Sequence, residues 1–510
     1  MPVPVTSAHV ANVAFINPAL SNLMPQYYLI RDCIAGEVAV KAARTKYLPM
    51  PDKSDTSKEN KARYEEYLAR AVFYNVARRT LSGLSGQVFL RDPVVELPSQ
   101  LKLLERNVSG SGVTLTQQAK KAVNYALAYS RCGIHVDFPD TTNGGESGAV
   151  TVRDMTEQKV RPTLNLYSPM EIINWRVVEN GAEDQLSLVV LSESYIIGDD
   201  GFEIKEAAQF RVLKLVNGEY VQEIWREPNP SKYTPGEVPK GKNFQVSEVY
   251  YPTGPDGKRL TEIPFKFIGG ENNDVAPDNP AFYDLASLNL AHYRNSADYE
   301  ESCFIVGQPT PVATGLTEEW VKNVLGGRLN FGSRGGIVLP PNATAELLQA
   351  QENTMIKEAM ETKERQMVAL GAKLVEQKTV QRTATEATQE KVSESSALSS
   401  STLNVQSAYV WALEIAAKFA GVEGAAIKFE LNTDFDISHM TPEQRKQTVE
   451  EWQKGAITFK EMRAVLRKAG TATEDDETAQ QDIAKAEAEA LAAAAKAMEI
   501  SNPDGGLNDA

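Results

Sequence analysis

The chain has 510 residues, which allows two to four domains and an ample core. Its 42% apolar and 24% charged composition is typical of soluble globular proteins. The 53 basic residues are outnumbered by 68 acidic ones, and the resulting net charge of -15 argues against a protein that grips nucleic acid, because such binding needs many Lys and Arg contacts with phosphate. It does not exclude a protein past which DNA slides.

The sequence has no signal-peptide pattern at its N-terminus and no run of roughly 18 uncharged apolar residues that would span a membrane. We therefore expect a protein that is neither secreted nor inserted into a membrane. The three cysteines, Cys33, Cys132 and Cys303, are far apart and form no C-x-x-C motif. This pattern predicts buried free thiols in a reducing compartment rather than disulfides or a zinc site.

Residues 1–58 are rich in proline and are interpreted as an irregular N-terminal arm with one helix near 24–40. From 59 to 82, apolar and aromatic residues recur at intervals of three and four, which predicts one helix with a buried stripe. The stripe consists of Tyr64, Tyr67, Leu68, Ala71, Val72, Val76 and Leu81. Gly83 and Gly86 are expected to break this helix, after which the chain becomes extended.

A second helix is predicted over 115–130, followed by a strand from Gly133 and by further β-rich runs. The clearest β signal surrounds Asn217-Gly218, which predicts a two-residue type I′ hairpin turn, because both central residues need a positive φ. The flanking residues alternate apolar and polar, so we expect a small antiparallel sheet with one buried and one wet face. The motif GDDG at 198–201 predicts another turn.

After a loop over 226–280, Asn279-Pro280 predicts the start of a long helix. This helix should end near residue 304 and be about 36 Å long. A compact insert follows, with a short helix over 318–325, glycine turns and a short strand over 336–339.

A second long helix is predicted from about residue 352, because apolar residues recur at intervals of four and three. Its seam consists of Ile356, Met360, Lys363, Met367, Leu370 and Leu374, from which only Lys363 departs. After a polar strip at 376–392, a third long helix over 394–420 should end at Gly421. Residues 427–436 then have a strand pattern, and the chain is predicted to be helical beyond 441.

No motif for catalysis, a metal or a cofactor is found. The four histidines share no local motif, and neither H-E-x-x-H nor G-x-S-x-G occurs. The glycine-rich run at 326–336 lacks the G-K-[ST] of a phosphate-binding loop and indicates turns. The acidic residues 475–477 lie in a charged, repetitive tail and indicate a solvated surface. We therefore expect no catalytic residues, although a triad assembled in space stays open.

Five stretches of the sequence, together with the order of its segments, resemble the portal proteins of tailed bacteriophages. The stretches are YEEYLARAVFYNVARRTLSGLSGQVFLRDP (64–93), YSPMEIINWRVV (167–178), FYDLASLNLAHYRNSADYE (282–300), and KFELNTDFD (428–436) followed by EEWQKGAITFKEMRAVLRKAG. The resemblance extends over about residues 20–470 and involves no invariant catalytic residue.

The resemblance implies an α+β, mainly helical fold that assembles as a ring of about twelve subunits. Its implied parts are an N-terminal arm (1–58), a wing (59–278), a first stem helix (279–304), a clip (305–350), a second stem helix (351–375), a tunnel loop (376–392), a long spine helix (393–420), a wing return strand (421–440), a helical crown (441–499) and a disordered tail (500–510). About twelve helices packed 8 to 10 Å apart would leave a bore of roughly 28 Å, wider than duplex DNA of roughly 20 Å.

The resemblance also implies three sets of site residues. Side chains of the tunnel loop would lie beside DNA without holding it tightly, since each neutralised phosphate adds a barrier to sliding. These residues are Lys378, Thr379, Gln381, Arg382, Thr383, Thr385, Thr388, Gln389 and Lys391. In the stem, Lys363 and Lys373 are candidates for the channel wall or for contacts between subunits. In the clip, aromatic and arginine residues are candidates for docking a partner, because these types are enriched at interface centres. They are Trp320, Arg328, Phe331 and Arg334.

The same residues also have purely structural interpretations. Composition alone favours an exposed, flexible connector for the strip at 376–392 and a snorkelling side chain at the seam edge for Lys363. For Trp320 and residues 331–336, turn formation and local packing stand beside partner docking.

The implied function is that of a portal, a non-enzymatic ring at the capsid vertex through which double-stranded DNA is packaged and ejected. The implied partners are other copies of the chain, double-stranded DNA, the terminase large subunit, a tail adaptor, and the major capsid and scaffolding proteins, with no membrane and no cofactor. The ring would be assembled in the host cytoplasm and reside in the virion. The alternatives are another virion ring or head-to-tail adaptor and, from a different class, a nuclease subunit.

Overall fold

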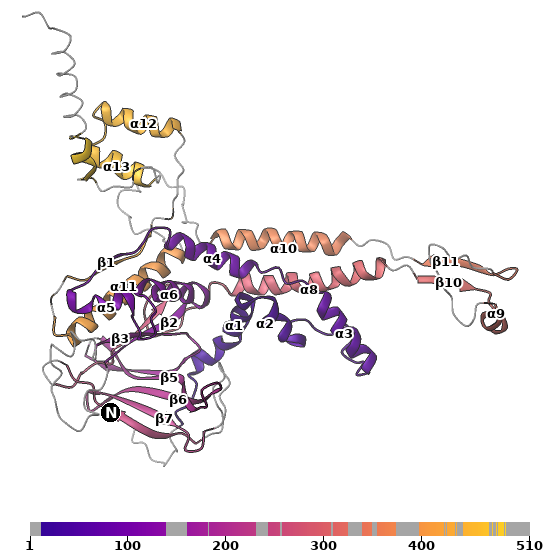
Figure 1. The fold of residues 1–510 in the computed structure, drawn as a ribbon, viewed down its shortest axis with the longest axis horizontal. Helices are drawn as coiled ribbons and strands as arrows, with labels where there is room; N and C mark the ends of the chain where they lie inside the picture. Colours follow the sequence, from indigo (N-terminus) through magenta and orange to yellow (C-terminus); the bar gives the residue numbers. More distant parts are fainter. Residues whose placement is uncertain are drawn as a thin grey trace, which may run out of the picture. The chain divides into compact units, whose positions relative to one another are not determined.

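The computed structural model describes residues 12–138, 161–181, 183–230, 243–254, 258–307, 310–324, 339–348, 354–373, 397–422, 424, 426–433, 435, 442–468, 472, 476, 478–483 and 485. The chain folds as two compact units, Met1–Asn432 and Thr433–Ala510. The first unit contains two main antiparallel sheets and most of the helices (Figure 1).

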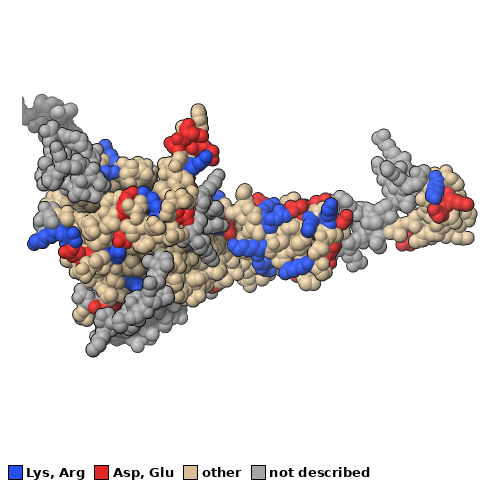
Figure 2. Space-filling view, turned by 90° about the horizontal axis from the view of Figure 1, so that it is seen from below, with Lys and Arg blue, Asp and Glu red and all other residues tan. Residues whose placement is uncertain are grey.

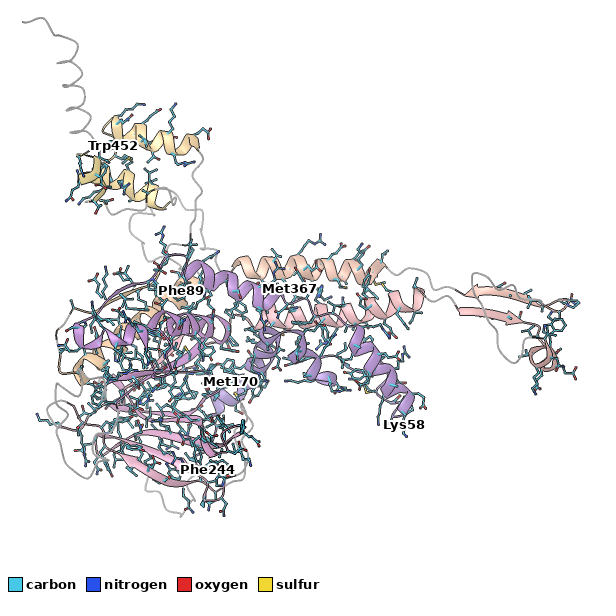
Figure 3. All side chains as sticks on the ribbon, in the orientation of Figure 1. Lys58, Phe89, Met170, Phe244, Met367 and Trp452 are labelled. Atoms are coloured by element: carbon cyan, nitrogen blue, oxygen red, sulfur yellow. The ribbon has the colours of Figure 1, made fainter. Side chains whose placement is uncertain are left out.

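The larger sheet has the strand order β4-β5-β6-β7-β8 and is a simple meander. Its strands are β4 Ile172–Asn180, β5 Glu183–Asp199, β6 Ile204–Val216, β7 Glu219–Arg226 and β8 Gln245–Tyr250. The smaller sheet places β2, Arg131–Asp137, between β3, Thr163–Tyr167, and β9, Phe265–Gly269. The core of the larger sheet includes Ile173, Val190, Phe210 and Phe244, the last of which is labelled in Figure 3.

The two turns predicted within the larger sheet are confirmed. Asn217 and Gly218 join β6 to β7 with φ values of 52° and 82°, as a type I′ turn requires. Residues 200–203 join β5 to β6, and there the Asp200 carboxylate accepts hydrogen bonds from the backbone N–H groups of Phe202 and Glu203 at 2.9 and 2.6 Å. Local turn chemistry was therefore sufficient to place both reversals.

The expectation of one wet face for β6 and β7 is wrong. The polar residues Gln209, Gln222 and Glu223 are buried. Their polar atoms are paired within the sheet, for example Glu223 with Lys214 at 2.6 Å, so burial leaves them satisfied. Two strands, β8 and β9, also lie within the predicted loop 226–280. β9 was missed because its pairing partner is distant in sequence, as in the register of Cys132 with Ile268, whereas β8 pairs with the preceding strand β7.

The N-terminal region is more helical than predicted. It contains α1 Pro18–Ala35, α2 Glu37–Ala42, η1 Arg44–Lys46, α3 Lys58–Arg70 and α4 Val76–Val88. The helix expected near 24–40 is interrupted by Gly36, whose φ is 97°. The single helix expected over 59–82 is also wrong, because the Asn75 side chain caps a new helix by accepting from Arg78 N at 2.9 Å.

Gly83 and Gly86 lie inside α4 and do not end it. A Cβ atom at either position would meet nothing within 4 Å, so these glycines cost only helix propensity. Most of the predicted stripe is buried, but Val72 lies in the break between α3 and α4 and is 50% exposed.

The helices predicted over 115–130 and 394–420 are observed as α6, Leu115–Tyr129, and α11, Ala397–Phe419. They pack against each other, and Tyr409 Oη donates to Gln118 Oε1 at 3.1 Å in their interface. Gly421 follows α11 with a φ of 69°, as predicted. The unit also contains the shorter elements β1 Val94–Glu96, η2 Ser99–Leu101, α5 Leu103–Arg106 and β12 Lys428–Glu430, with β1 pairing β12.

The second unit contains α12, Pro442–Gln453, and α13, Phe459–Lys468, which agrees with the helical prediction beyond 441. Trp452, labelled in Figure 3, packs edge-on against Phe459 with ring centroids 5.8 Å apart. Among the helices that are described, none is long and apolar enough to cross a membrane. Cys33 and Cys132 are buried free thiols as predicted, whereas Cys303 is exposed, so the prediction is wrong for that residue.

Candidate functional site: the paired helices α8 and α10

The first long helix of the predicted stem is α8, Tyr283–Val306. It begins later than the expected Asn279-Pro280 start, because Pro280 belongs to a turn whose carbonyl accepts from Tyr283 N at 3.0 Å. The position before the helix is Phe282, which is fully buried and offers no side-chain cap. Core packing rather than capping therefore sets this helix start.

One side of α8 is held by the N-terminal helices. Asn289 bridges the break between α3 and α4, since its amide accepts from Ala77 N at 3.1 Å and donates to Tyr74 O at 2.8 Å. Ser296 accepts from Val72 N in the same break at 3.1 Å. Buried polar side chains of α8 thus satisfy the backbone groups that the break leaves without a helical partner.

The C-terminal half of α8 is held by α3. Tyr67 Oη donates to Asp298 Oδ1 at 2.6 Å, and burial together with this bond raises the pKa of Tyr67. Arg70 forms an ion pair with Glu301, and its guanidinium lies 4.1 Å from the centre of the Phe304 ring. These contacts fix α8 almost to its last turn.

The second long helix is α10, Thr354–Lys373, which lies alongside α8 and runs in the opposite direction (Figure 1). Among the described side chains of α10, the fully buried one is Met367, which is labelled in Figure 3. Glu364 lies 3.1 Å from Nε2 of His292 on α8. The predicted seam is confirmed up to residue 370, because its members are the less exposed residues of this helix.

The other side of α10 is largely uncovered. Met355 is 71% exposed and Val368 is 69% exposed. Lys363 is partly buried at the edge of the seam, and Lys373 is the last residue of α10, with its side chain outside the described residues. The structure therefore places both predicted stem lysines on the helix pair without assigning either one a role.

The predicted clip contains a two-stranded sheet of β10, Thr310–Thr314, and β11, Thr344–Leu348. Its short helix is α9, Glu318–Asn323, close to the predicted 318–325, and Thr317 caps it by accepting from Trp320 N at 3.3 Å. Trp320 is partly buried.

Most remaining site predictions lie outside the described residues. These are Arg328, Phe331 and Arg334 of the predicted clip, most of the predicted strand 336–339, and the whole polar strip 376–392 with its candidates from Lys378 to Lys391. They stay predictions from the resemblance.

Figure 2 views the molecule from the side of α2 and α3 and shows Lys and Arg side chains gathered there. Acidic neighbours balance them, since Lys41 lies 2.8 Å from Glu37 and Arg44 pairs with Glu65. Exposed ion pairs of this kind contribute little to stability. These pairs neutralise part of the positive charge on this surface.

A largely buried polar cluster between the two main sheets was not predicted. Arg211 Nε donates to Glu193 at 2.8 Å, and an Arg211 terminal nitrogen lies 3.3 Å from Asp137. Burial raises the pKa of Asp137. Burial also acts to raise the pKa of Glu193, but Arg211 and hydrogen bonds outweigh it and leave that pKa lowered. Alternating strand residues with polar character were the only sequence signal for this cluster.

His135 belongs to the same cluster and is 1% exposed. Its Nε2 lies 3.3 Å from Tyr220 Oη, and burial lowers the pKa of His135 to about 3. The imidazole is therefore neutral at physiological pH. No group of three or more potential metal ligands occurs among the residues that the structure describes.

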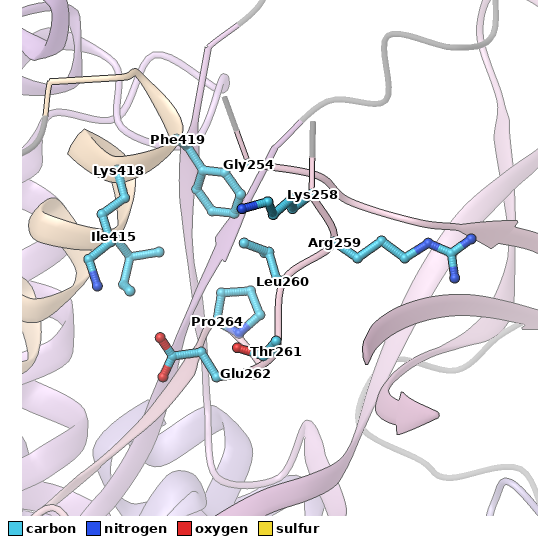
Figure 4. Close-up of a pocket in the computed structure, with 10 residues that line it drawn as sticks. All are labelled: Gly254, Lys258, Arg259, Leu260, Thr261, Glu262, Pro264, Ile415, Lys418 and Phe419. Atoms are coloured by element: carbon cyan, nitrogen blue, oxygen red, sulfur yellow. The ribbon is translucent and has the colours of Figure 1, made fainter. Parts of the chain in front are cut away.

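A pocket of about 370 Å³ lies between the loop after β8 and the end of α11 (Figure 4). Its apolar lining is Leu260, Pro264, Ile415 and Phe419, and its charged residues are Lys258, Arg259, Glu262 and Lys418. Figure 4 shows the Lys258 side chain directed towards the Phe419 ring, whereas Arg259 points away from the pocket.

Residues 281–420, which include α8, the predicted clip, α10 and α11, match a family model described as a domain of unknown function, DUF4055. Among solved structures, a chain from the neck of an empty GTA particle, computed with C6 symmetry, is 13% identical with a TM-score of 0.37. That match covers 79% of this chain and 92% of the other chain. No curated protein matches the sequence.

Proposed function

We propose that this chain is the subunit of a virion ring at the head-to-tail junction and that the ring is a portal for double-stranded DNA. The observation that carries the proposal is the antiparallel pair of α8 and α10, joined through a small β-containing insert and followed by the long helix α11. This is the order of stem, clip, stem and spine that the resemblance of residues 282–300 to portal proteins implies.

The distribution of contacts on the helix pair supports assembly. α8 is held on one side by α3 and α4, whereas α10 leaves Met355 and Val368 exposed. In the proposed ring, a neighbouring subunit covers these apolar side chains. The acidic net charge of -15 suits a wall past which DNA moves, because it does not hold phosphate.

In this proposal the chain has no catalytic role. The ATPase would reside in the terminase large subunit docked at the clip, and a tail adaptor would bind after packaging. Scaffolding and major capsid proteins would contact the ring during assembly in the host cytoplasm.

Electron microscopy and analytical ultracentrifugation of the purified chain test the ring. We expect closed rings of about twelve subunits with a central bore. A protein that stays monomeric or dimeric at all concentrations, temperatures and salt conditions would overturn the proposal.

Deletion of residues 376–392 tests the channel separately. We expect rings of unchanged size and a reduced yield of packaged or retained DNA in particles, because the deleted strip is the part proposed to line the bore. Loss of rings would instead assign this strip to assembly, and full packaging would remove it from the channel.

A further inference from the structure

The hairpin that joins β5 to β6 carries apolar side chains that nothing in the described part of the same chain covers. Phe202 is 100% exposed, and Ile196 and Ile204 are 58% and 55% exposed. β4 pairs with β5 only up to Leu191, and β7 pairs with β6 only from Gln209. The end of this hairpin is therefore a two-stranded ribbon that extends beyond the five-stranded sheet.

The exposed phenylalanine is held by an ordered turn. Asp199 accepts from Gly201 N at 2.8 Å, and Asp200 accepts from Phe202 N and Glu203 N. An aromatic side chain on a fixed backbone loses little conformational entropy when it is buried, which is the property of an interface anchor. Asp199, Asp200 and Glu203 also make its surroundings acidic.

The pocket of Figure 4 is complementary to this hairpin end, because it combines an apolar lining with basic residues. Its apolar floor includes Ile415 and Phe419, which are 8% and 4% exposed, and Lys258 and Lys418 lie at its margin beside a single acidic residue, Glu262. Its volume of about 370 Å³ lies within the range of roughly 300 to 1,000 Å³ that is usual for binding pockets.

The hairpin end and the pocket lie at opposite ends of the larger sheet. The loop that lines the pocket is tied to the β6–β7 turn, since Tyr220 N donates to Leu260 O at 2.7 Å and Arg259 lies 2.5 Å from Glu219. The β5–β6 turn is at the other end of β6, whose 13 residues span roughly 40 Å. The hairpin of one chain therefore cannot fill its own pocket.

We propose that Phe202 of each subunit inserts into the pocket formed by Leu260, Ile415 and Phe419 of the next copy of this chain. A contact between two different surfaces of identical subunits is heterologous. Such contacts close into a ring when the rotation between neighbouring subunits permits it. The acidic hairpin end and the two lysines at the margin orient the docking. This inference rests on the proposed ring and identifies one contact that closes it.

Charge exchange tests the contact in the full-length protein. Glu203→Lys and Lys418→Glu should each raise, by about tenfold, the subunit concentration at which half of the chains are in rings, and the double variant should restore it. Phe202→Ser should raise this concentration at least tenfold, with an unchanged circular dichroism spectrum, because the side chain is exposed in the monomer. Val38→Ser, at an apolar position that is 84% exposed on α2, is the matched control and should have no effect.

Cysteine cross-linking tests the geometry independently. In a Cys303→Ser background, Glu203→Cys combined with Lys418→Cys should yield a ladder of covalent multimers on oxidation, whereas Glu203→Cys combined with Val38→Cys should not. Wild-type rings together with no ladder and no effect of Phe202→Ser would overturn this contact and leave the ring proposal intact. A wild-type chain that forms no rings would overturn both.

Discussion

At the scale of residues, polar side chains at two places inside the first unit are satisfied by specific partners. Asn289 supplies both an acceptor and a donor to the backbone break beside α8. Arg211 neutralises Glu193 and lies near Asp137 between the sheets. Removal of one partner from such a set costs more than the set contributes, because the other partner is left buried without a bond.

His135 is the residue whose titration should be visible in the stability of the protein. Its folded pKa of about 3 lies below the ordinary value of 6.5, so the unfolded state binds more protons at any pH between these values. The free energy of unfolding should therefore fall as pH drops below 6.5, by up to about 1.4 kcal/mol per pH unit.

Urea denaturation of wild-type protein and His135→Gln between pH 7 and 5 checks this prediction. The variant should have a smaller pH slope, whatever its stability at pH 7. Equal slopes for the two proteins would show that His135 does not carry the dependence.

At the scale of elements, α8 and α10 differ in how they are held. α8 is bonded to α3, to α4 and to the break between them, whereas α10 contacts α8 around Met367, the one fully buried side chain among those of α10 that are described. Gly371 of α10 also lies close to Thr80 of α4. A Cβ atom added at Gly371 would lie 3.2 Å from the Cγ2 atom of Thr80. α10 should therefore be the more easily displaced helix of the pair.

Met367→Ala tests the attachment of α10. The substitution should lower the free energy of unfolding by about 2 to 5 kcal/mol, or open α10 locally by a similar amount, because it removes buried methylene groups and leaves a cavity. Val368→Ala is the neighbouring control and should change stability by less than about 0.5 kcal/mol, since Val368 is 69% exposed. Hydrogen exchange of the α10 amides, together with denaturant unfolding, would distinguish these outcomes. Similar effects at both positions would contradict the assigned packing.

At the scale of the whole molecule, the division into Met1–Asn432 and Thr433–Ala510 separates both main sheets, α8, α10 and α11 from the C-terminal helices. All the contacts proposed for the ring, including Phe202 and its pocket, belong to the first unit. The C-terminal unit has its own small aromatic contact at Trp452.

A chain that ends at Asn432 should therefore fold on its own, because a compact unit with its own core does not depend on a neighbouring unit. Its thermal unfolding should remain cooperative, with a midpoint close to that of the full-length protein. Calorimetry measures both properties. An aggregated or unfolded product would mean that residues 433–510 complete the core of the first unit.

Local sequence was enough to predict the features that depend on neighbouring residues. Asn217-Gly218 specified its turn through positive φ, Gly421 ended α11, and intervals of three and four located the seam around Met367. The remaining features depend on contacts between residues that are distant in sequence. The break at residues 71–75 persists because Asn289 and Ser296, more than 200 residues away, satisfy its backbone. The strand β9 and the buried Arg211 cluster likewise depend on partners distant in sequence, whose hydrogen bonds and burial no local pattern records.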